Sequence, residues 1–221
     1  PIIATSIYRM MDKVMLGQLS TMRQVGLYEN SEKLINVCLC VISAFGAVMM
    51  PRMSNLYAQK KDNECKELFN RSMEIAMFIG CAIAFGISSI AKDFIPIFYG
   101  NGYKECINIT IILSSTVLFI TWACIIRTLY LIPTEKNRIY IYSVFIGAGI
   151  NVIINWILIP QLASIGAALG TIAAEVTVAV YQTIAIRNEL DIFKCMRKAV
   201  PFVIFGINMF VVVSVIPINI G

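Results

Sequence analysis

Three charged residues lie close together in an otherwise apolar stretch near the start of the sequence, TSIYRMMDKVMLG. Arg9, Asp12 and Lys13 are three and four residues apart, so a helix places Arg9 beside both of the others, and Thr5 extends the same face. Charged side chains inside apolar helices usually face the interior of a bundle and mark the path of a substrate or an ion. The alternative is that this helix end lies near the membrane surface, where the long basic side chains reach water.

Three further apolar stretches carry polar residues suited to transport. Glu175 lies in the middle of TIAAEVTVAVYQ, too deep for its short side chain to reach the membrane surface. It would either pair with a basic residue of a neighbouring helix or line a cavity. Arg127, before TLYLIP, would reach toward the surface or join the same cavity. Asn151 and Asn155 are one helical turn apart and would either form hydrogen bonds to a neighbouring helix or line the substrate cavity with the other candidates.

Long apolar blocks supply the elements that would position these residues. Of the 221 residues, 58% are hydrophobic and only 14% are charged, whereas soluble domains contain about 25% charged residues. Blocks of about 20 apolar residues without two-residue alternation indicate membrane-spanning helices rather than a β-barrel. We therefore predict an all-α integral membrane protein with seven spans. They cover residues 1–17, 25–50, 72–91, 106–131, 139–160, 164–186 and 199–219.

The basic residues between the spans orient the predicted helices. The loops 51–71, 132–138 and 187–198 contain eleven lysines and arginines, and the loops on the opposite side contain three. Loops rich in Lys and Arg stay in the cytoplasm, so these three loops are predicted to be cytoplasmic. Pro51 and Pro133 are expected to end the second and fourth spans there. The segments YGNGY (99–103) and IPQLASIG (159–166) are expected to be external turns.

Several functional classes find no support in the sequence. The chain contains no histidine, so imidazole is excluded as a metal ligand or a general base. Its seven cysteines form no CxxC pair, and neither a GxxxxGK(S/T) phosphate loop nor a GxSxG nucleophile motif occurs. The net charge of +5 comes mostly from short loops between apolar blocks and does not indicate nucleic acid binding. We expect a transporter rather than an enzyme, with no cofactor and no metal.

Four segments, in order along the chain, resemble one family of transporters. MDKVMLGQLSTMRQVGLYENSEKLI (11–35) is similar to the start of the second half of bacterial oligosaccharide flippases. MMPRMSNLYAQKK (49–61) and FIPIFYGNGY (94–103) resemble their proline-basic cytoplasmic loop and an external loop. INVIINWILIPQLASIGAALGTIAAE (150–175) resembles one of their helix pairs. The resemblance is to the polysaccharide branch of the multidrug/oligosaccharidyl-lipid/polysaccharide exporter superfamily.

The resemblance implies a fold. The chain would be the second lobe of a two-lobe, MATE-like exporter. Residues 1–186 would form the C-terminal six-helix lobe, and residues 187–221 would form a cytoplasmic loop and an additional transmembrane helix. The N-terminal lobe would lie outside this sequence.

The resemblance also implies an activity. It is the translocation of an undecaprenyl-diphosphate-linked oligosaccharide from the inner to the outer leaflet of the bacterial cell membrane by alternating access. The product would serve surface polysaccharides such as O-antigen lipopolysaccharide. The lipid bilayer, a polysaccharide polymerase and other envelope-assembly proteins are the implied partners.

The charged residues fit this activity, and alternatives stay open. A lipid-linked diphosphate needs basic groups in a hydrated cleft, which Arg9, Lys13 and Arg127 would supply while Asp12 and Glu175 balance charge or respond to protons. A multidrug cation antiporter of the same superfamily would have a more acidic cavity than this set, whose net charge is +1. A non-transporting membrane partner in cell-envelope assembly would need no hydrated cavity. A peptidoglycan-precursor flippase is a further alternative.

Reporter fusions test the predicted orientation. Fusions after Lys61, Arg138 and Lys194 are expected to report a cytoplasmic location, and fusions after Asn101 and Ala163 an external one, because basic loops remain inside. Opposite signals at any two of these positions would contradict the span assignment.

Overall fold

The computed structural model describes residues 2–215, and the side chains of residues 10–213. This part of the chain forms helices joined by short turns and contains no strand. The α-helices are α1 (Ile2–Leu19), α2 (Met22–Ala58), α3 (Asp62–Tyr99), α4 (Cys106–Ser114), α5 (Thr116–Ile126), α6 (Asn137–Leu162), α7 (Ser164–Ile186) and α8 (Ile192–Val215). A 3₁₀ turn, η1 (Asn101–Tyr103), precedes α4, and a π-helical turn, η2 (Arg127–Leu131), follows α5.

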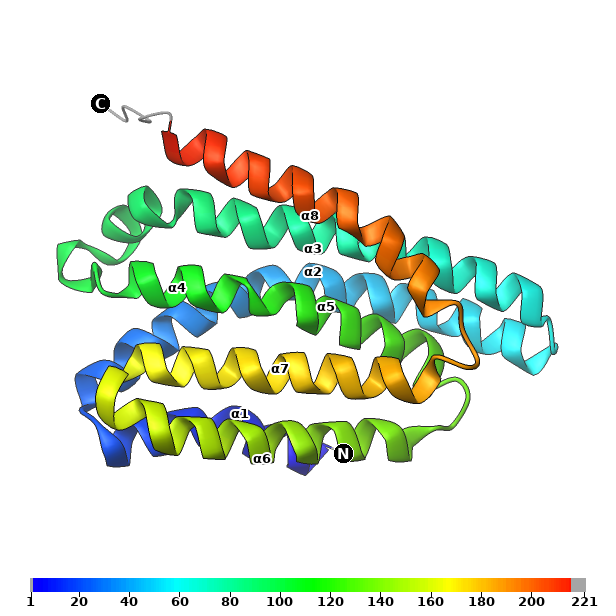
Figure 1. Cartoon of the computed structure of the whole chain (residues 1–221), viewed down its shortest axis with the longest axis horizontal. Coiled ribbons are helices and arrows are strands. Elements are labelled where there is room, and N and C mark those ends of the chain that lie inside the picture. Colours follow the sequence, from blue (N-terminus) through cyan, green and yellow to red (C-terminus); the bar gives the residue numbers. More distant parts are fainter. Residues whose placement is uncertain (1, 216–221) are drawn as a thin grey trace.

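The helices lie side by side in one bundle (Figure 1). Helix α6 packs mainly on α7, α8 packs on α3, and α1 packs on α6 and α2. The α2–α3, α5–α6 and α7–α8 connections gather at one end of the bundle, on the right of Figure 1, and the α1–α2, α3–α4 and α6–α7 connections lie at the opposite end. The three loops with the basic excess therefore share one end, which we call the basic end.

Length and composition make this an all-α membrane protein, as the sequence predicts. Within residues 2–215, six segments are long and apolar enough to span a bilayer: α2, α3, the continuous segment Cys106–Leu131, α6, α7 and the Ile192–Val213 part of α8. Helix α1 is not among them, and its 18 residues include the charges of Arg9, Asp12 and Lys13. It depends on polar partners inside the bundle, because charged groups in hydrocarbon are costly.

The structure corrects several predicted boundaries. Helix α2 does not end at Pro51 but continues to Ala58, so the predicted loop 51–71 is reduced to residues 59–61. A proline inside a helix removes one hydrogen bond and costs about 3 kcal/mol. Here Met53, two residues further on, is fully buried in an apolar cluster that also contains Phe69 and Leu129, and this packing offsets the cost.

Two other prolines mislead in the same way, whereas one expectation holds. Helix α3 runs through Pro96 to Tyr99, and α6 runs through Pro160 to Leu162. The predicted external turn IPQLASIG (159–166) is consequently reduced to Ala163, whereas the predicted turn YGNGY (99–103) lies in a connection that covers residues 100–105. One is entered at Gly100 and the other is centred on Ala163, and both residues have positive φ. Pro133 does lie in a turn after the fourth predicted span, as expected.

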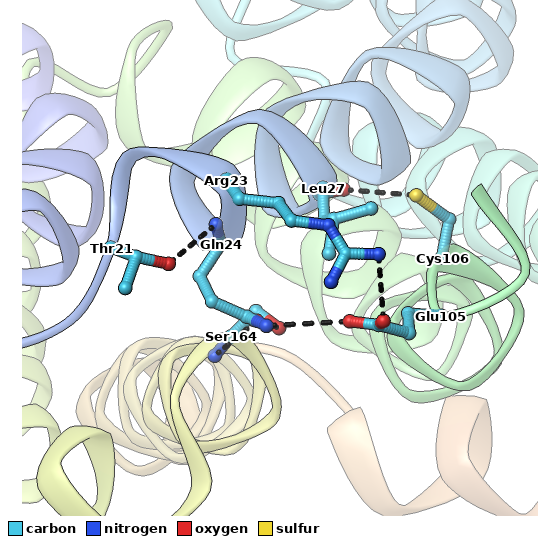
Figure 2. Close-up of polar contacts among 7 residues, drawn as sticks. All are labelled: Thr21, Arg23, Gln24, Leu27, Glu105, Cys106 and Ser164. Atoms are coloured by element: carbon cyan, nitrogen blue, oxygen red, sulfur yellow. Dashed lines mark hydrogen bonds and ion pairs between the residues drawn. The ribbon is translucent and has the colours of Figure 1, made fainter. Parts of the chain in front are cut away.

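Polar contacts clamp the end opposite the basic loops (Figure 2). Gln24 Nε2 donates a hydrogen bond to Glu105 Oε2 at 3.3 Å, and Gln24 Oε1 accepts from the Ser164 hydroxyl and from its backbone N–H. Arg23 pairs with Glu105 at 2.9 Å. These four residues, the outer clamp, join the starts of α2 and α7 to the residue before α4.

A second cluster ties two turns at the basic end. The Lys136 ammonium and the Tyr130 hydroxyl both donate to Glu189 Oε2. These hydrogen bonds, first that of Lys136, hold the pKa of Glu189 below its usual range. The α5–α6 and α7–α8 connections are thereby linked.

The outer clamp predicts unequal effects of two glutamine substitutions. Gln24→Ala breaks contacts among three helix ends, so we expect a loss of about 1–2 kcal/mol of stability and a lower melting temperature in detergent. Gln59→Ala is the matched control, because Gln59 Nε2 donates only to Asn55 of its own helix. Equal melting temperatures of the two variants would show that the clamp does not stabilise the bundle.

Candidate functional site

A buried carboxylate is the centre of the polar interior. The Asp12 side chain on α1 is only 4% exposed. Its Oδ1 accepts hydrogen bonds from Asn151 Nδ2 at 2.8 Å and from Asn155 Nδ2 at 2.6 Å. Its Oδ2 accepts from the Tyr28 hydroxyl at 3.1 Å and from the Thr171 hydroxyl at 3.2 Å. Helices α2, α6 and α7 thus each supply donors to one carboxylate on α1.

All of these donors are electrically neutral. Among the described side chains, no Lys or Arg nitrogen forms an ion pair with Asp12. Lys13, the next residue, pairs instead with Glu32 of α2 at 2.9 Å. The side chain of Arg9 lies outside the described residues. The carboxylate is therefore solvated by dipoles and not neutralised by a described cation.

Small residues on α6 and α7 allow the close packing that this arrangement requires. A Cβ atom on Gly166 would lie 2.5 Å from the Leu158 carbonyl oxygen, and one on Gly147 would lie 2.7 Å from Val178. At Gly170 the added atom would lie 2.0 Å from Asn155 Oδ1. Small residues in membrane helices allow such close approach. Gly170 thus makes room for the amide that Asn155 directs at Asp12.

Two cavities lie along the polar interior, and the Asp12 carboxylate lines the first of them. The first, the carboxylate cavity, has a volume of about 50 Å³, and its lining includes Asp12, Glu32 and Glu175. The second, the arginine cavity, has a volume of about 120 Å³, and its lining includes Arg127, Glu175 and Gln182. Both volumes suffice for a few waters or a phosphate-sized group, but pockets that bind drug-sized ligands measure about 300–1,000 Å³. An oligosaccharide does not fit in either.

Glu175 connects the two cavities. It follows Thr171 by one turn of α7 and lines both spaces, as do the apolar side chains of Leu39 and Ile120. Moving along α7 toward the basic end, the order is Thr171 at the carboxylate, then Glu175, then Gln182. The polar interior therefore extends along the bundle rather than forming one compact pocket.

Arg127 lies at the inner wall of the arginine cavity. It is the first residue of the π-helical turn η2, a type of distortion frequent at functional sites. Its Nη1 approaches the Tyr140 hydroxyl and its Nη2 the Cys124 sulfur, both at 3.5 Å, and its guanidinium lies 5.4 Å from the centre of the Tyr140 ring. These are long contacts, and no ion pair to Arg127 occurs among the described residues. The guanidinium keeps capacity to bind an anion.

The structure thus groups the predicted residues in three ways. Asp12, Asn151 and Asn155 are in direct contact, whereas Glu175 and Arg127 share a cavity wall. Lys13 pairs with Glu32, which lines the carboxylate cavity. The roles predicted for all of these residues, and for Arg9, stay predictions.

Sequence reasoning missed three members of the site. Tyr28 and Thr171 contact Asp12, and Glu32 lines the carboxylate cavity. Tyr28 and Glu32 are one turn apart on α2, the spacing of a shared helix face, and this was the available signal.

Comparisons with known proteins agree with the motifs. Residues 2–108 match a family described as polysaccharide biosynthesis protein. The chain is 24% identical over 167 residues to the probable low-salt glycan biosynthesis flippase Agl15 of Haloferax volcanii, covering 74% of this chain and 34% of that protein. It is 28% identical over 162 residues to the capsular polysaccharide biosynthesis protein CapF of Staphylococcus aureus, covering 71% of this chain and 37% of that protein. This chain is similar to polysaccharide flippases. The resemblance predicted from the sequence is confirmed.

The similarities cover only part of the length of the two relatives. The flippase-like chain spans about a third of the length of the two curated relatives. No solved structure matches it. It is a multi-pass membrane protein related to proteins of polysaccharide biosynthesis.

The close approach at Gly170 generates a prediction. Gly170→Ala places a methyl group where the Asn155 amide lies, so we expect loss of the hydrogen bond to Asp12 and a destabilisation of about 2–4 kcal/mol. Gly149→Ala on α6 is the control, because nothing lies within 4 Å of its added Cβ. Thermal unfolding in detergent compares the two, and a Gly170 variant as stable as the control would contradict the described packing.

Proposed function

We propose that this chain forms the second lobe of a flippase that moves an undecaprenyl-diphosphate-linked oligosaccharide from the inner to the outer leaflet of a bacterial cell membrane by alternating access. The name of one relative supports a flippase in glycan biosynthesis, and the name of the other supports a role in capsular polysaccharide biosynthesis. The small cavity volumes are compatible with this proposal if the oligosaccharide lies between this lobe and its partner lobe. Residues 1–186 would form the lobe, and residues 187–221 an additional element.

The observation that carries the proposal is the buried Asp12 carboxylate. Moving a carboxylate from water to an apolar interior costs several kcal/mol even after relaxation, and a bundle that only needed stability would avoid this cost. Functional sites are where such groups are retained. A transporter uses one by loading it with a proton or a monovalent cation in one conformation and releasing that ion in another.

The number of hydroxyl protons around Asp12 favours reversible binding of a proton or a cation there. Asp12 Oδ2, the Tyr28 hydroxyl and the Thr171 hydroxyl lie pairwise within 3.2 Å, because the two hydroxyls are also only 2.8 Å apart. Two hydroxyl protons serve at most two of these three contacts, and Thr171 also contacts the Ala167 carbonyl at 3.0 Å. A proton on Asp12, or a small cation among the oxygens, would satisfy one of the contacts that remain. We infer that ion exchange at Asp12 drives the conformational cycle.

Arg127 is the proposed contact for the diphosphate. Its guanidinium lies toward the basic end, where a lipid-linked substrate would enter from the cytoplasmic leaflet. The long contacts to Tyr140 and Cys124 orient the guanidinium and leave its N–H groups able to bind an anion. Arg9 and Lys13, on α1, are the further candidates predicted from the sequence.

The acidic lining supports one alternative. The two cavities together contain the carboxylates of Asp12, Glu32 and Glu175 against the guanidinium of Arg127. With Lys13, which pairs with Glu32, the set is net acidic, whereas the set chosen from the sequence was net basic. An organic-cation antiporter would use such a lining directly. We interpret it as the path of the coupling ion.

Two substitutions test the proposal in the intact protein. Asp12→Asn removes the ion-exchanging group but keeps its shape, and Arg127→Gln removes the guanidinium. A lost charge-assisted contact is worth roughly 1.5–3 kcal/mol, or about ten- to a hundredfold. We expect each variant to lower surface polysaccharide by at least about tenfold in a strain that lacks its own flippase, at unchanged protein level.

The controls are Asp93→Asn and Arg138→Gln, which change exposed charges outside the cavities. Normal polysaccharide with Asp12→Asn would remove the ion-coupling role. Loss of organic-cation resistance, with polysaccharide unchanged, would favour the antiporter instead.

A further inference from the structure

A groove at the basic end lies between the first turns of α3 and α8, which pack against each other (Figure 1). Its volume is about 360 Å³. Four cations and two acids contribute to its lining, and they are Lys66, Arg71, Lys194, Lys198, Glu67 and Asp191. None of them lines either cavity near Asp12, so this basic groove is a separate feature.

Ion pairs in and beside the groove occupy only two of the four cations. Arg71 pairs with Glu67 at 2.7 Å, and Lys198 pairs with Glu74 at 2.6 Å. Lys66 and Lys194 are exposed and form no ion pair among the described residues. Two ammonium groups that line one concave site favour an anion with several oxygens, and a phosphate group is such an anion.

An apolar seam continues from the groove along the same two helices. The rings of Phe78 on α3 and Phe202 on α8 meet edge to face, with centres 5.6 Å apart. Phe78 is 57% exposed and Phe205 is 71% exposed. Phe202 and Phe205 follow Lys198 by four and seven residues, which places them roughly 6–10 Å deeper along the helix axis. The cationic groove therefore lies above exposed aromatic side chains.

We propose that the basic groove binds the phosphate headgroup of an anionic phospholipid, whose acyl chains lie along the seam of Phe78, Phe202 and Phe205. Free phosphate would use the lysines but not the seam, and a neutral lipid would use the seam but not the lysines. Basic pockets between membrane helices at the cytoplasmic surface bind anionic headgroups by the same combination. The bound lipid bridges α3 and α8, and the proposal does not depend on the transported substrate.

Native mass spectrometry of the intact purified protein tests the proposal with phosphatidylglycerol and phosphatidylcholine as probes. We expect phosphatidylglycerol to bind at least about tenfold more tightly, in a salt-sensitive manner. The double variant Lys66→Gln, Lys194→Gln should bind it about 30-fold more weakly, which corresponds to about 2 kcal/mol at roughly 1 kcal/mol for each lysine. The double variant Lys60→Gln, Arg138→Gln removes the same charge from exposed sites outside the groove and should bind it normally.

A third variant tests the same site by a gain of binding. Asp191→Asn removes a negative charge from the groove, and asparagine suits a position before a helix as well as aspartate does, so phosphatidylglycerol should bind several-fold more tightly. Equal affinity of the two double variants, or equal binding of the two lipids, would overturn the proposal. So would displacement of phosphatidylglycerol by millimolar inorganic phosphate, which would identify a simple anion site. Preferential binding of a polyprenyl diphosphate would assign the groove to the transported lipid instead.

Discussion

The burial of one negative charge constrains the arrangement of half of the bundle. Asp12 lies in an apolar environment, so its carboxylate requires donors within hydrogen-bond distance from every side. Tyr28, Asn151, Asn155 and Thr171 meet this requirement from three helices, 16 to 159 residues away along the chain. Helix α1 carries too much charge to be counted among the apolar spans, and these donors are what make its position in the bundle favourable.

This requirement explains why α6 and α7 pack more closely than ordinary side chains permit. The two asparagines reach Asp12 only because α7 presents Gly170, and not a larger residue, at the level of Asn155. The small residues and the polar residues therefore form one system, in which backbone proximity is needed for the hydrogen bonds. The spacing of three small residues on α7, Gly166, Gly170 and Ala174, by itself indicates only helix packing. Gly170, however, is part of the carboxylate site.

The sequence predicted those parts of the fold that depend on local composition. Apolar blocks of sufficient length located the spans, and spacing placed Asn151 and Asn155 on one face that hydrogen bonds to a neighbouring helix. Pro51, Pro96 and Pro160 misled because local backbone preference was outweighed by burial of the surrounding residues in a bundle. The identity of the helix opposite the asparagines was not predictable, because nothing in one sequence relates position 12 to position 155. The spacing of Tyr28 and Glu32 indicated a shared helix face, but the contact of Tyr28 with Asp12 was not predictable for the same reason.

Charges of opposite sign are separated along the bundle, and this separation bears on the transport that we propose. Asp12 is held by residues near the end opposite the basic loops, Arg127 lies near the basic loops, and Glu175 lines both intervening cavities. An anion bound at Arg127 and a cation bound at Asp12 would therefore occupy different levels rather than compete for one pocket. Each would act on the other through Glu175 and through the packing of α7, which contributes residues to both levels. Coupling between two such sites requires only that both ligands favour particular positions of this one helix.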